Sequence, residues 1–456
     1  MRRLVAVLLC LVLLLSFAAC TNDQTVSLPS STDPNPVVPP TSSNMPSSDP
    51  EWEPPESKPS SRPTSSTITP SLSGPSSSLS GSNPEDTVIL PEEPPQDASV
   101  HFSHYCYSKL TDLQKEYYEA MYTAVQNMQI GWIPLGKKEA AYKTDVAVVR
   151  NAIANDHPDI FWLPPYYATA VANSPDGKPT VLVYFAASSE SEPSYLVSRS
   201  QAEEMKLALN KAADQIVSAV TATDPYEKEL QLHDLLCQWV EYSDDPADGM
   251  KYSAFGALVN KKAVCEGYSR AMQLLLGKMG ITAVTVTGTG GGEGHMWNAV
   301  NLWGEWYHLD VTWNDTKGDV ISREYFNLTD SAILLDHTFS KNYDEFGPDE
   351  LGDGTVSFNI NRPVCKDTVY NYFNKSGFVF FADSVSALAG YLTRQTADVV
   401  EVRFADSGVR DAVYKNTNSY IDRLNEALYV DYPDCGFYVG AVSVSSTVLR
   451  MYKKRT

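Results

Sequence analysis

Three short stretches decide the fold: AVCEGYSRA at residues 263–271, GHMWNAV at 294–300 and WYHLDVTWND at 306–315. The first stretch leads into an apolar run over 271–279 that predicts a helix. Cys265 therefore stands at the start of that helix. The positive end of a helix favours a thiolate, and a thiolate is the nucleophile that a cysteine enzyme requires.

The other two stretches predict strands over 295–301 and 305–311, joined by a tight turn at Trp303-Gly304. With this turn, residues that face each other across the hairpin have numbers that sum to 607. His295 and Asp310 are then diagonal neighbours on one face, with Cα atoms ~7–8 Å apart. The other face is mostly apolar, which is typical of a core-facing side. The pattern indicates a carboxylate that orients an imidazole.

A strand over 281–287 and a glycine-rich stretch over 288–294 separate the predicted helix from the hairpin. The glycines lack the spacing of a phosphate-binding loop and lead into a strand rather than a helix. We therefore expect a mobile lip beside a cleft. Three aromatic residues near the site, Trp297, Tyr268 and Tyr252, are candidates for the cleft wall.

The order of these stretches resembles the transglutaminase-like superfamily, in which a Cys opens a helix and a His and an Asp follow on adjacent strands. The flanking segments SAFGALVNKKAVC and EYFNLTDSAILLDHTF are also similar to secreted bacterial members, and the resemblance covers residues 240–340 best. It implies that Cys265 is the nucleophile, His295 the general acid and base, and Asp310 the orienting carboxylate.

The resemblance implies an α+β fold, a papain-like core in which helices pack on an antiparallel sheet. We place this catalytic domain at 224–350, after a helical and β region at 101–223. The Cys265 N–H can serve as one oxyanion donor, and Tyr252 or Tyr242 is a candidate for the side-chain donor. For His308 and His337 we expect surface or packing roles.

The chemistry that the three residues imply is acyl transfer on an amide or peptide bond through a thioester. Water as acceptor gives a protease or amidase, and a Lys-type amine gives a cross-linking enzyme. The residues do not separate these outcomes, although the resemblance favours hydrolysis. The expected substrate is a protein or peptide, including cell-wall peptide, and neither a cofactor nor a metal is required.

Two other functions remain open. The fold could serve only as a binding or scaffold protein at the cell wall, because a fold does not establish an activity. The chain could also be a wall-degrading or wall-modifying helper whose specificity lies in its C-terminal part.

The first 20 residues predict a secretory signal, because Met1-Arg2-Arg3 precedes an apolar run over 4–19. The run is short for a membrane span. It ends in Phe17-Ala18-Ala19-Cys20, which resembles the bacterial lipobox. We predict a lipoprotein signal at 1–20, lipidation at Cys20, and a position on the extracellular face of the cytoplasmic membrane. Cleavage after Ala19 without a lipid is the alternative.

Residues 21–100 hold seventeen of the chain's 29 prolines and are also rich in Ser and Thr. Such a segment cannot bury enough apolar surface to offset the entropy lost on ordering. We therefore predict a disordered, semi-extended tether. A Pro-rich ligand for a partner domain is the alternative.

Charge and cysteine content exclude further classes. The net charge of −21 argues against nucleic-acid binding, which requires clustered Lys and Arg. None of the seven Cys forms a C-x-x-C pair, so zinc and redox motifs have no support. With Cys10 in the leader and Cys20 lipidated, five thiols remain and at least one is unpaired. A Cys365–Cys435 disulfide is one possible pairing.

The pattern restarts after residue 363. We predict strands over 377–382, 399–404 and 437–448, and helices over 384–394 and 409–428. This alternation is typical of a small α/β module, which we place at 364–456. It carries no recognisable catalytic constellation.

Overall fold

The computed structural model describes residues 104–173, 177–188, 191, 193–245, 248–316, 321–346, 357–377, 379–380, 384–443 and 447–455. All of them fall within one compact unit. The predicted signal at 1–20 and tether at 21–100 lie outside the described residues. Among the described residues, no helix is both long and apolar enough to cross a membrane.

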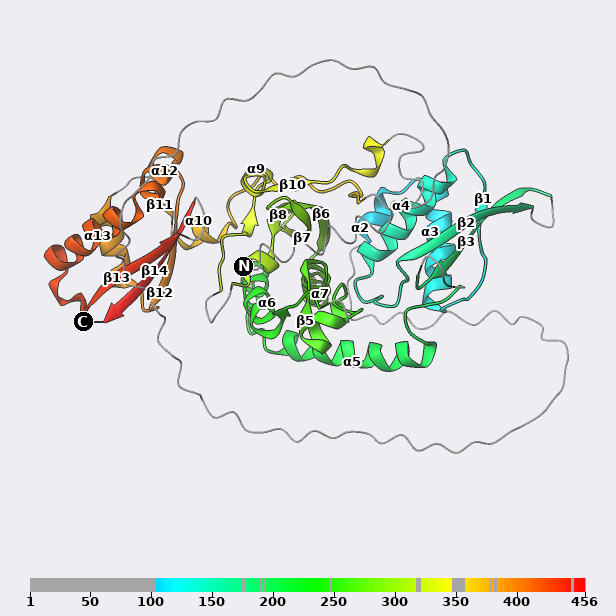
Figure 1. Ribbon diagram of the computed structural model, residues 1–456, viewed down its shortest axis with the longest axis horizontal. Coiled ribbons are helices and arrows are strands. Elements are labelled where there is room, and N and C mark those ends of the chain that lie inside the picture. Colours follow the sequence, from blue (N-terminus) through cyan, green and yellow to red (C-terminus); the bar gives the residue numbers. More distant parts are fainter. Residues whose placement is uncertain are drawn as a thin grey trace, which may run out of the picture. The chain divides into compact units, whose positions relative to one another are not determined.

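Helices and a small antiparallel sheet make up the first part of the described chain (Figure 1). Its three strands run in the order β1-β3-β2. A capping box starts α3, because the Thr111 hydroxyl accepts from the Gln114 N–H and the Gln114 side chain accepts from the Thr111 N–H. The elements are α2 (Tyr105–Lys109), α3 (Asp112–Gln126), β1 (Ile133–Lys137), α4 (Tyr142–Asp156), β2 (Tyr166–Asn173), β3 (Pro179–Ala186) and α5 (Arg199–Ser218).

The central part is a five-stranded antiparallel sheet with the helix α7 packed on it (Figure 1). The strand order is β10-β6-β7-β8-β9. This α+β core, with helices on an antiparallel sheet, is the predicted fold class. Its elements are α6 (Pro225–Trp239), β4 (Glu241–Tyr242), the π-helix η1 (Gly256–Asn260), β5 (Lys262–Ala263), α7 (Cys265–Lys278), β6 (Ala283–Gly290), β7 (Glu293–Leu302), β8 (Glu305–Leu309), α8 (Val311–Asn314), β9 (Phe326–Leu328), α9 (Asp330–Ile333) and β10 (His337–Phe339).

The predicted hairpin register is confirmed. Strands β7 and β8 pair from Asn298↔Leu309 to Leu302↔Glu305, so each pair sums to 607. Trp303 and Gly304 form the turn with φ of 53° and 96°. Two positive φ values match the right-handed twist of the flanking strands, and this match fixes the register.

The glycine-rich stretch differs from the expected mobile lip. Strands β6 and β7 pair as far as Gly290↔Glu293, so most of the stretch is regular hairpin. Only Gly291 and Gly292, with φ of 60° and 88°, form the turn. The prediction is wrong because glycines can also serve where a strand must approach other groups closely. At Gly288, an added Cβ would lie 1.8 Å from the Thr338 carbonyl oxygen of β10.

Hydrophobic side chains cover both faces of the sheet. One face joins the main core, which holds Val300, Tyr307 and Leu309. The other face carries a smaller cluster that includes Val286, Trp297 and Ala299. His295 and Asp310 belong to the second face, so they lie beside this smaller hydrophobic cluster.

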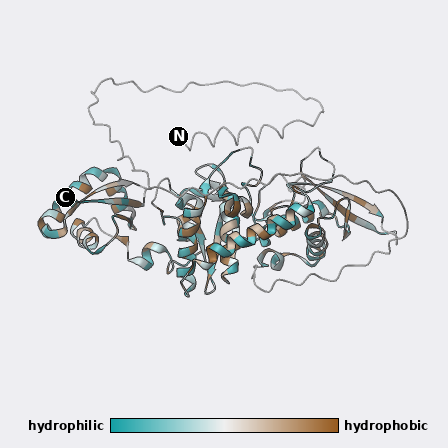
Figure 2. Ribbon diagram, turned by 90° about the horizontal axis from the view of Figure 1, so that it is seen from below, coloured by the Kyte–Doolittle hydropathy of each residue, from teal (hydrophilic) through white to brown (hydrophobic). Residues whose placement is uncertain are grey.

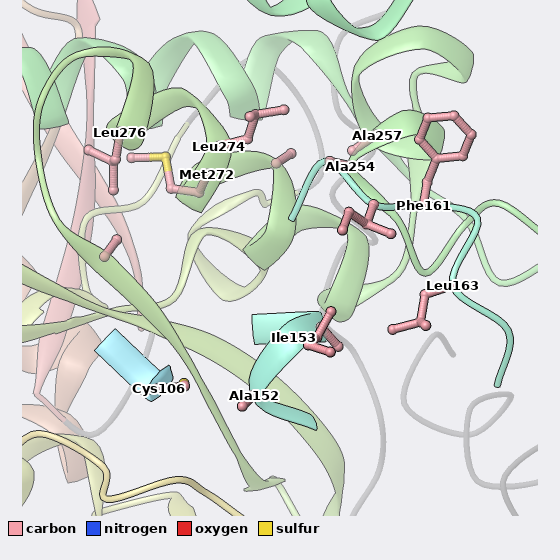
Figure 3. Close-up of a cluster of buried hydrophobic side chains, with 14 of the residues drawn as sticks. Cys106, Ala152, Ile153, Phe161, Leu163, Ala254, Ala257, Met272, Leu274 and Leu276 are labelled. Atoms are coloured by element: carbon pink, nitrogen blue, oxygen red, sulfur yellow. The ribbon is translucent and has the colours of Figure 1, made fainter. Parts of the chain in front are cut away.

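The main core is continuous from the first part of the chain into the central part. Figure 3 shows side chains of α4, of the loop that follows it and of α7 in one cluster, including Ile153, Phe161, Met272 and Leu276. In Figure 2, apolar and polar residues alternate along α5. The buried positions of that helix, Ala202, Leu209, Ala213 and Ile216, recur at helical spacing.

Hydrogen bonds tie the end of α4 to α7. Gln273 Nε2 of α7 donates to the Asn155 carbonyl oxygen at 2.6 Å, and Arg270 donates to the Ala154 carbonyl oxygen. Thr285 of β6 donates to Asn155 Oδ1 at 2.7 Å. These three bonds fix α7 and the sheet to the region that precedes them in the sequence.

The last part of the chain is a small α/β module with strand order β11-β12-β14-β13. The predicted helix over 409–428 is two helices that meet at Asn416, and the predicted last strand is a hairpin. Cys365 and Cys435 are free thiols, so the possible disulfide is absent. The elements are η2 (Tyr343–Glu345), α10 (Tyr372–Ser376), β11 (Val379–Phe380), α11 (Val385–Arg394), β12 (Val399–Phe404), α12 (Ser407–Lys415), α13 (Thr417–Asp431), η3 (Pro433–Cys435), β13 (Phe437–Ser443) and β14 (Val448–Arg455).

Candidate active site

Cys265 is the first residue of α7, as predicted, and it is half-buried. Close packing of the chain fixes this start. The Val264 N–H donates to the Lys251 carbonyl oxygen at 3.1 Å. An added Cβ at Gly267 would lie 2.4 Å from the same oxygen. Glycine at this position therefore lets the first turn of α7 rest directly on the backbone of residue 251.

His295 and Asp310 meet at the edge of the sheet. His295 lies in β7, and Asp310 is the N-cap of α8, one residue after β8 ends. His295 Nε2 lies 2.7 Å from Asp310 Oδ2. The other carboxylate oxygen, Oδ1, accepts from the Trp313 N–H at 3.1 Å, so the carboxylate is held from two sides.

The thiol completes this arrangement. The Cys265 thiol interacts with His295 and contributes to the raised pKa of the imidazole. Because Nε2 faces Asp310, Nδ1 is the ring nitrogen that remains for the sulfur. The structure therefore brings together the three predicted residues, in the order thiol, imidazole, carboxylate.

Electrostatics favour a charged imidazole. Burial lowers the pKa of His295, but the Asp310 carboxylate and the Cys265 thiol outweigh burial and raise this pKa to about 10. Burial likewise works against the Asp310 carboxylate, yet His295 and His337 hold its pKa well below its usual range. His295 is thus an imidazolium at neutral pH, paired with a carboxylate that stays ionised.

Aromatic rings and a glycine restrict the imidazole. The His295 ring stacks on the Trp297 ring, with 5.9 Å between the ring centroids, and lies tilted against the Trp313 ring, with 5.6 Å between the centroids. An added Cβ at Gly290 would lie 2.9 Å from Trp313 Cζ2 and 3.0 Å from His295 Cδ2. The missing side chain at Gly290 therefore provides the space that the His295 and Trp313 rings occupy.

Two of the three predicted cleft residues are buried. Trp297 and Tyr268 are both fully inaccessible, so the prediction that they line the cleft is wrong for this structure. Trp297 Nε1 donates to His308 Nδ1 at 3.0 Å, and the Tyr268 hydroxyl donates to the Val240 carbonyl oxygen at 3.0 Å. Of the three, Tyr252 is the exposed residue, with 44% of its surface accessible.

His337 joins the site, although the sequence predicted a surface or packing role for it. Its Nε2 lies 3.2 Å from Asp310 Oδ2, the oxygen that also faces His295. Its Nδ1 lies 2.6 Å from Asp336 Oδ1. The Asp336-His337 pair in the sequence was the available signal, but the pairing of β10 with β6 that delivers it could not be foreseen.

His308 is also buried and paired with a carboxylate. Its Nε2 lies 2.8 Å from Asp330 Oδ1, which also accepts from Arg362 and from the Cys365 N–H, each at 3.1 Å. The side chains of His308, Asp330 and Cys365 form a group whose potential metal-ligand atoms all lie within 4.8 Å of one another. His295, Asp310 and His337 form a second such group. In both groups, however, the contacts are those of hydrogen-bond donors around one carboxylate oxygen, and no metal is required to explain them.

The other described thiols are poor nucleophiles, with one exception. Burial raises the pKa values of Cys106, Cys237 and Cys365. Cys435, in the C-terminal module, is half-buried like Cys265. Among the described residues, Cys265 and Cys435 are therefore the two thiols that a reagent can reach.

A cavity of about 510 Å³ lies apart from these residues, between the central part and the C-terminal module. Its charged groups are already engaged. Asp234 pairs with Arg323, and Glu401 accepts from Arg450 at 2.7 Å. It therefore offers no catalytic constellation of its own.

Comparison with known proteins identifies the central part. Residues 211–311 match the model of the transglutaminase-like superfamily core. Kyphoscoliosis peptidase of Mus musculus and that of Homo sapiens are each 28% identical to this chain over 129 residues. The match covers 24% of this chain and 20% of each relative, so the chain spans about a fifth of the length of these proteins.

Two solved structures also match at low similarity. A structure described as a TGase has 14% identity and a TM-score of 0.24, over 33% of this chain and 45% of its own. A proposed cysteine protease from Cytophaga hutchinsonii has 15% identity and a TM-score of 0.21, over 32% of this chain and 62% of its own. The chain thus contains a transglutaminase-like core, and His337 lies beyond the matched residues.

Proposed function

We propose that this chain is a cysteine enzyme that transfers acyl groups from amide or peptide bonds through a thioester on Cys265. One observation carries the proposal: His295 lies 2.7 Å from Asp310, and the Cys265 thiol at the start of α7 acts on the same imidazole and helps to raise its pKa. This is the arrangement by which an imidazole accepts a proton from a nucleophile while a carboxylate orients it.

In the first step, the Cys265 sulfur attacks the carbonyl carbon while His295 gives its proton to the leaving nitrogen. The C–N bond breaks, the amine leaves, and a thioester remains. The Cys265 backbone N–H, at the first turn of α7, supports the developing oxyanion. Water or an amine then attacks the thioester and gives its proton to His295, which restores the thiolate and the imidazolium.

We propose hydrolysis as the main outcome. The two mammalian relatives are named as peptidases, and we carry that activity to this chain as part of the proposal. The substrate class is a protein or peptide, with cell-wall peptide as one member. A lipid on Cys20 would hold the enzyme at the extracellular face of the membrane, because each buried CH₂ of an acyl chain contributes roughly 0.8 kcal/mol.

The deciding experiment compares the two reachable thiols. The chain is treated near neutral pH with limiting iodoacetamide, and the alkylated positions are mapped by mass spectrometry. Cys265 should be labelled far faster than Cys435, since only Cys265 contacts an imidazolium. Equal, slow labelling of both would instead favour a catalytically idle scaffold.

Turnover is tested with a peptide library, with and without a labelled primary amine. Cys265→Ala should abolish both cleavage and amine incorporation without unfolding the chain, whereas the matched variant Cys435→Ala should retain them. Cleavage that is unaffected by the amine would support hydrolysis. Full activity in Cys265→Ala would remove the proposal.

A further inference from the structure

We infer that His337 is a positioning residue of this site: a fixed cation that lies behind Asp310 and tunes the pairing of His295 with Cys265. The inference rests on the proposed function, since it concerns the pair that performs the reaction. It adds to the Cys, His and Asp a second histidine that never reaches the substrate.

The geometry places His337 between two carboxylates. Its Nε2 lies 3.2 Å from Asp310 Oδ2, and its Nδ1 lies 2.6 Å from Asp336 Oδ1. The second oxygen of Asp336 accepts from the Tyr325 hydroxyl at 2.6 Å. A continuous line of contacts therefore runs from Tyr325 through Asp336, His337, Asp310 and His295 to Cys265.

Counting protons along this line assigns the charge of His337. An ionised carboxylate only accepts hydrogen bonds, and a neutral imidazole has only one N–H to donate. Since both ring nitrogens of His337 face a carboxylate oxygen, both must carry a proton, which makes the ring an imidazolium.

The remaining neighbours of His337 do not compete for this role. Three aromatic rings pack around it. Their centroids lie 4.3 Å (Trp313), 5.0 Å (Trp297) and 5.5 Å (Tyr325) from the centroid of the His337 ring. The titratable groups that face it are Asp336 beside it, Asp310 from the β8–α8 junction, Tyr325 before β9, and His295 of β7 at 5.5 Å, with His308 of β8 acting at longer range. Burial lowers the pKa of His337, but the two carboxylates outweigh it and raise this pKa.

Strand β10 is the element that delivers this group. His337 pairs with Gly290 across the β10–β6 ladder, and Gly290 is the residue over which the His295 and Trp313 rings lie. His337 is 1% exposed, so it cannot contact a substrate. Its effect on the reaction must therefore pass through Asp310.

The charge on His337 has a definite consequence for the pH dependence. It partly neutralises Asp310, and it repels the neighbouring imidazolium of His295. Without it, Asp310 would hold the proton on His295 more strongly, and His295 would lose a cation that repels it. Both changes raise the pKa of His295, by about one unit for a unit charge at this range.

The test measures the rate of Cys265 alkylation by iodoacetamide between about pH 4 and about pH 10, which needs no substrate. His337→Gln retains an N–H donor but removes the charge, and His337→Ala removes both. Asp336→Asn leaves His337 intact but withdraws its second carboxylate. The matched control is His157→Gln, which removes another buried histidine, one that pairs with the Tyr118 hydroxyl of α3 at 2.8 Å. Thermal unfolding is recorded for every variant.

We expect His337→Gln to shift the alkylation profile upward by about one pH unit, with Asp336→Asn shifting it in the same direction and His157→Gln leaving it in place. Unchanged profiles in His337→Gln, His337→Ala and Asp336→Asn, with only lower thermal stability, would overturn the inference. If His337→Gln does not fold, Asp336→Asn decides alone. A wild-type Cys265 that reacts no faster than Cys435 would overturn the proposed function, and this inference with it.

Discussion

His295 and Asp310 lie 2.7 Å apart through Nε2 and Oδ2, although Asp310 stands one residue beyond the end of the strand that pairs with β7. At that point the chain turns into α8, and the carboxylate serves as its N-cap by accepting from the Trp313 N–H. One side chain therefore both starts a helix and orients the imidazole, which fixes its position more firmly than strand pairing alone.

Asp310→Asn separates these two tasks. The amide oxygen can still cap α8, so the fold should persist, but the negative charge beside His295 is lost. We expect kcat/KM for the peptide substrate to fall by roughly 10³–10⁴-fold, as when a triad carboxylate is replaced by its amide. Because Asp310 raises the pKa of His295, the alkaline limb of the pH–rate profile should also move to lower pH. Activity above a tenth of wild type would contradict this role.

Gly290→Ala tests the space left for the two rings. The new methyl group would lie about 3 Å from both His295 and Trp313 and would displace the imidazole. We expect a loss of activity on the order of 10²-fold, typical of a catalytic group displaced by about 1 Å. Gly294→Ala is the matched control, since nothing lies within 4 Å of its added Cβ and its activity should be unchanged. Equal activities in the two variants would rule out the steric argument.

Glu229 predicts a pH-dependent stability. It is fully buried in α6 and accepts from Asn327 Nδ2 at 2.8 Å, and burial raises its pKa from 4.5 to about 8. The folded state holds this proton and the unfolded chain releases it, so stability is full below pH 4.5 and falls as the pH rises towards 8. Each unit in this window costs at most roughly 1.4 kcal/mol.

Glu229→Gln mimics the protonated side chain and should remove this loss. Urea unfolding at about pH 5 and about pH 9 should give similar free energies for the two proteins at the lower pH and a more stable variant at the higher one. Glu227→Gln, at an exposed position of the same helix, is the control and should change neither. An equal pH dependence in wild type and Glu229→Gln would show that Glu229 ionises normally.

The proposed lipid on Cys20 is tested in cells. Expressed in a bacterial host, the chain should incorporate labelled palmitate and fractionate with membranes, and Cys20→Ser should do neither. Cys10→Ser should behave like wild type, because residue 10 lies in the predicted signal that is removed. Label retained in Cys20→Ser would place the lipid elsewhere or show that the assignment is wrong.

Local patterns predicted much of the site. The start of α7 at Cys265 and the hairpin register each depend on a few adjacent residues: an apolar run with helical spacing, and a two-residue turn at Trp303-Gly304. Together they placed His295 and Asp310 on one face. The α+β class followed from the resemblance that these segments carry to the transglutaminase-like superfamily.

Contacts between distant segments could not be predicted. Trp297 and Tyr268 look like cleft residues in the sequence, but the smaller cluster and the main core cover them from elements far along the chain. His337 comes from β10, a strand of three residues that is too short to show an alternating pattern. Only its pairing with β6 brings it to Asp310.

The bonds from Ala154 and Asn155 to Arg270, Gln273 and Thr285 matter for the choice of expression fragments. A shortened protein that begins at Pro225 would contain the whole matched triad yet leave the flank of α7 open to water and those donors without their acceptors. Such a fragment would be a poor substitute for the longer chain, and an inactive preparation of it would say nothing about Cys265. Recombinant work should therefore start upstream of Tyr105 and keep the first sheet.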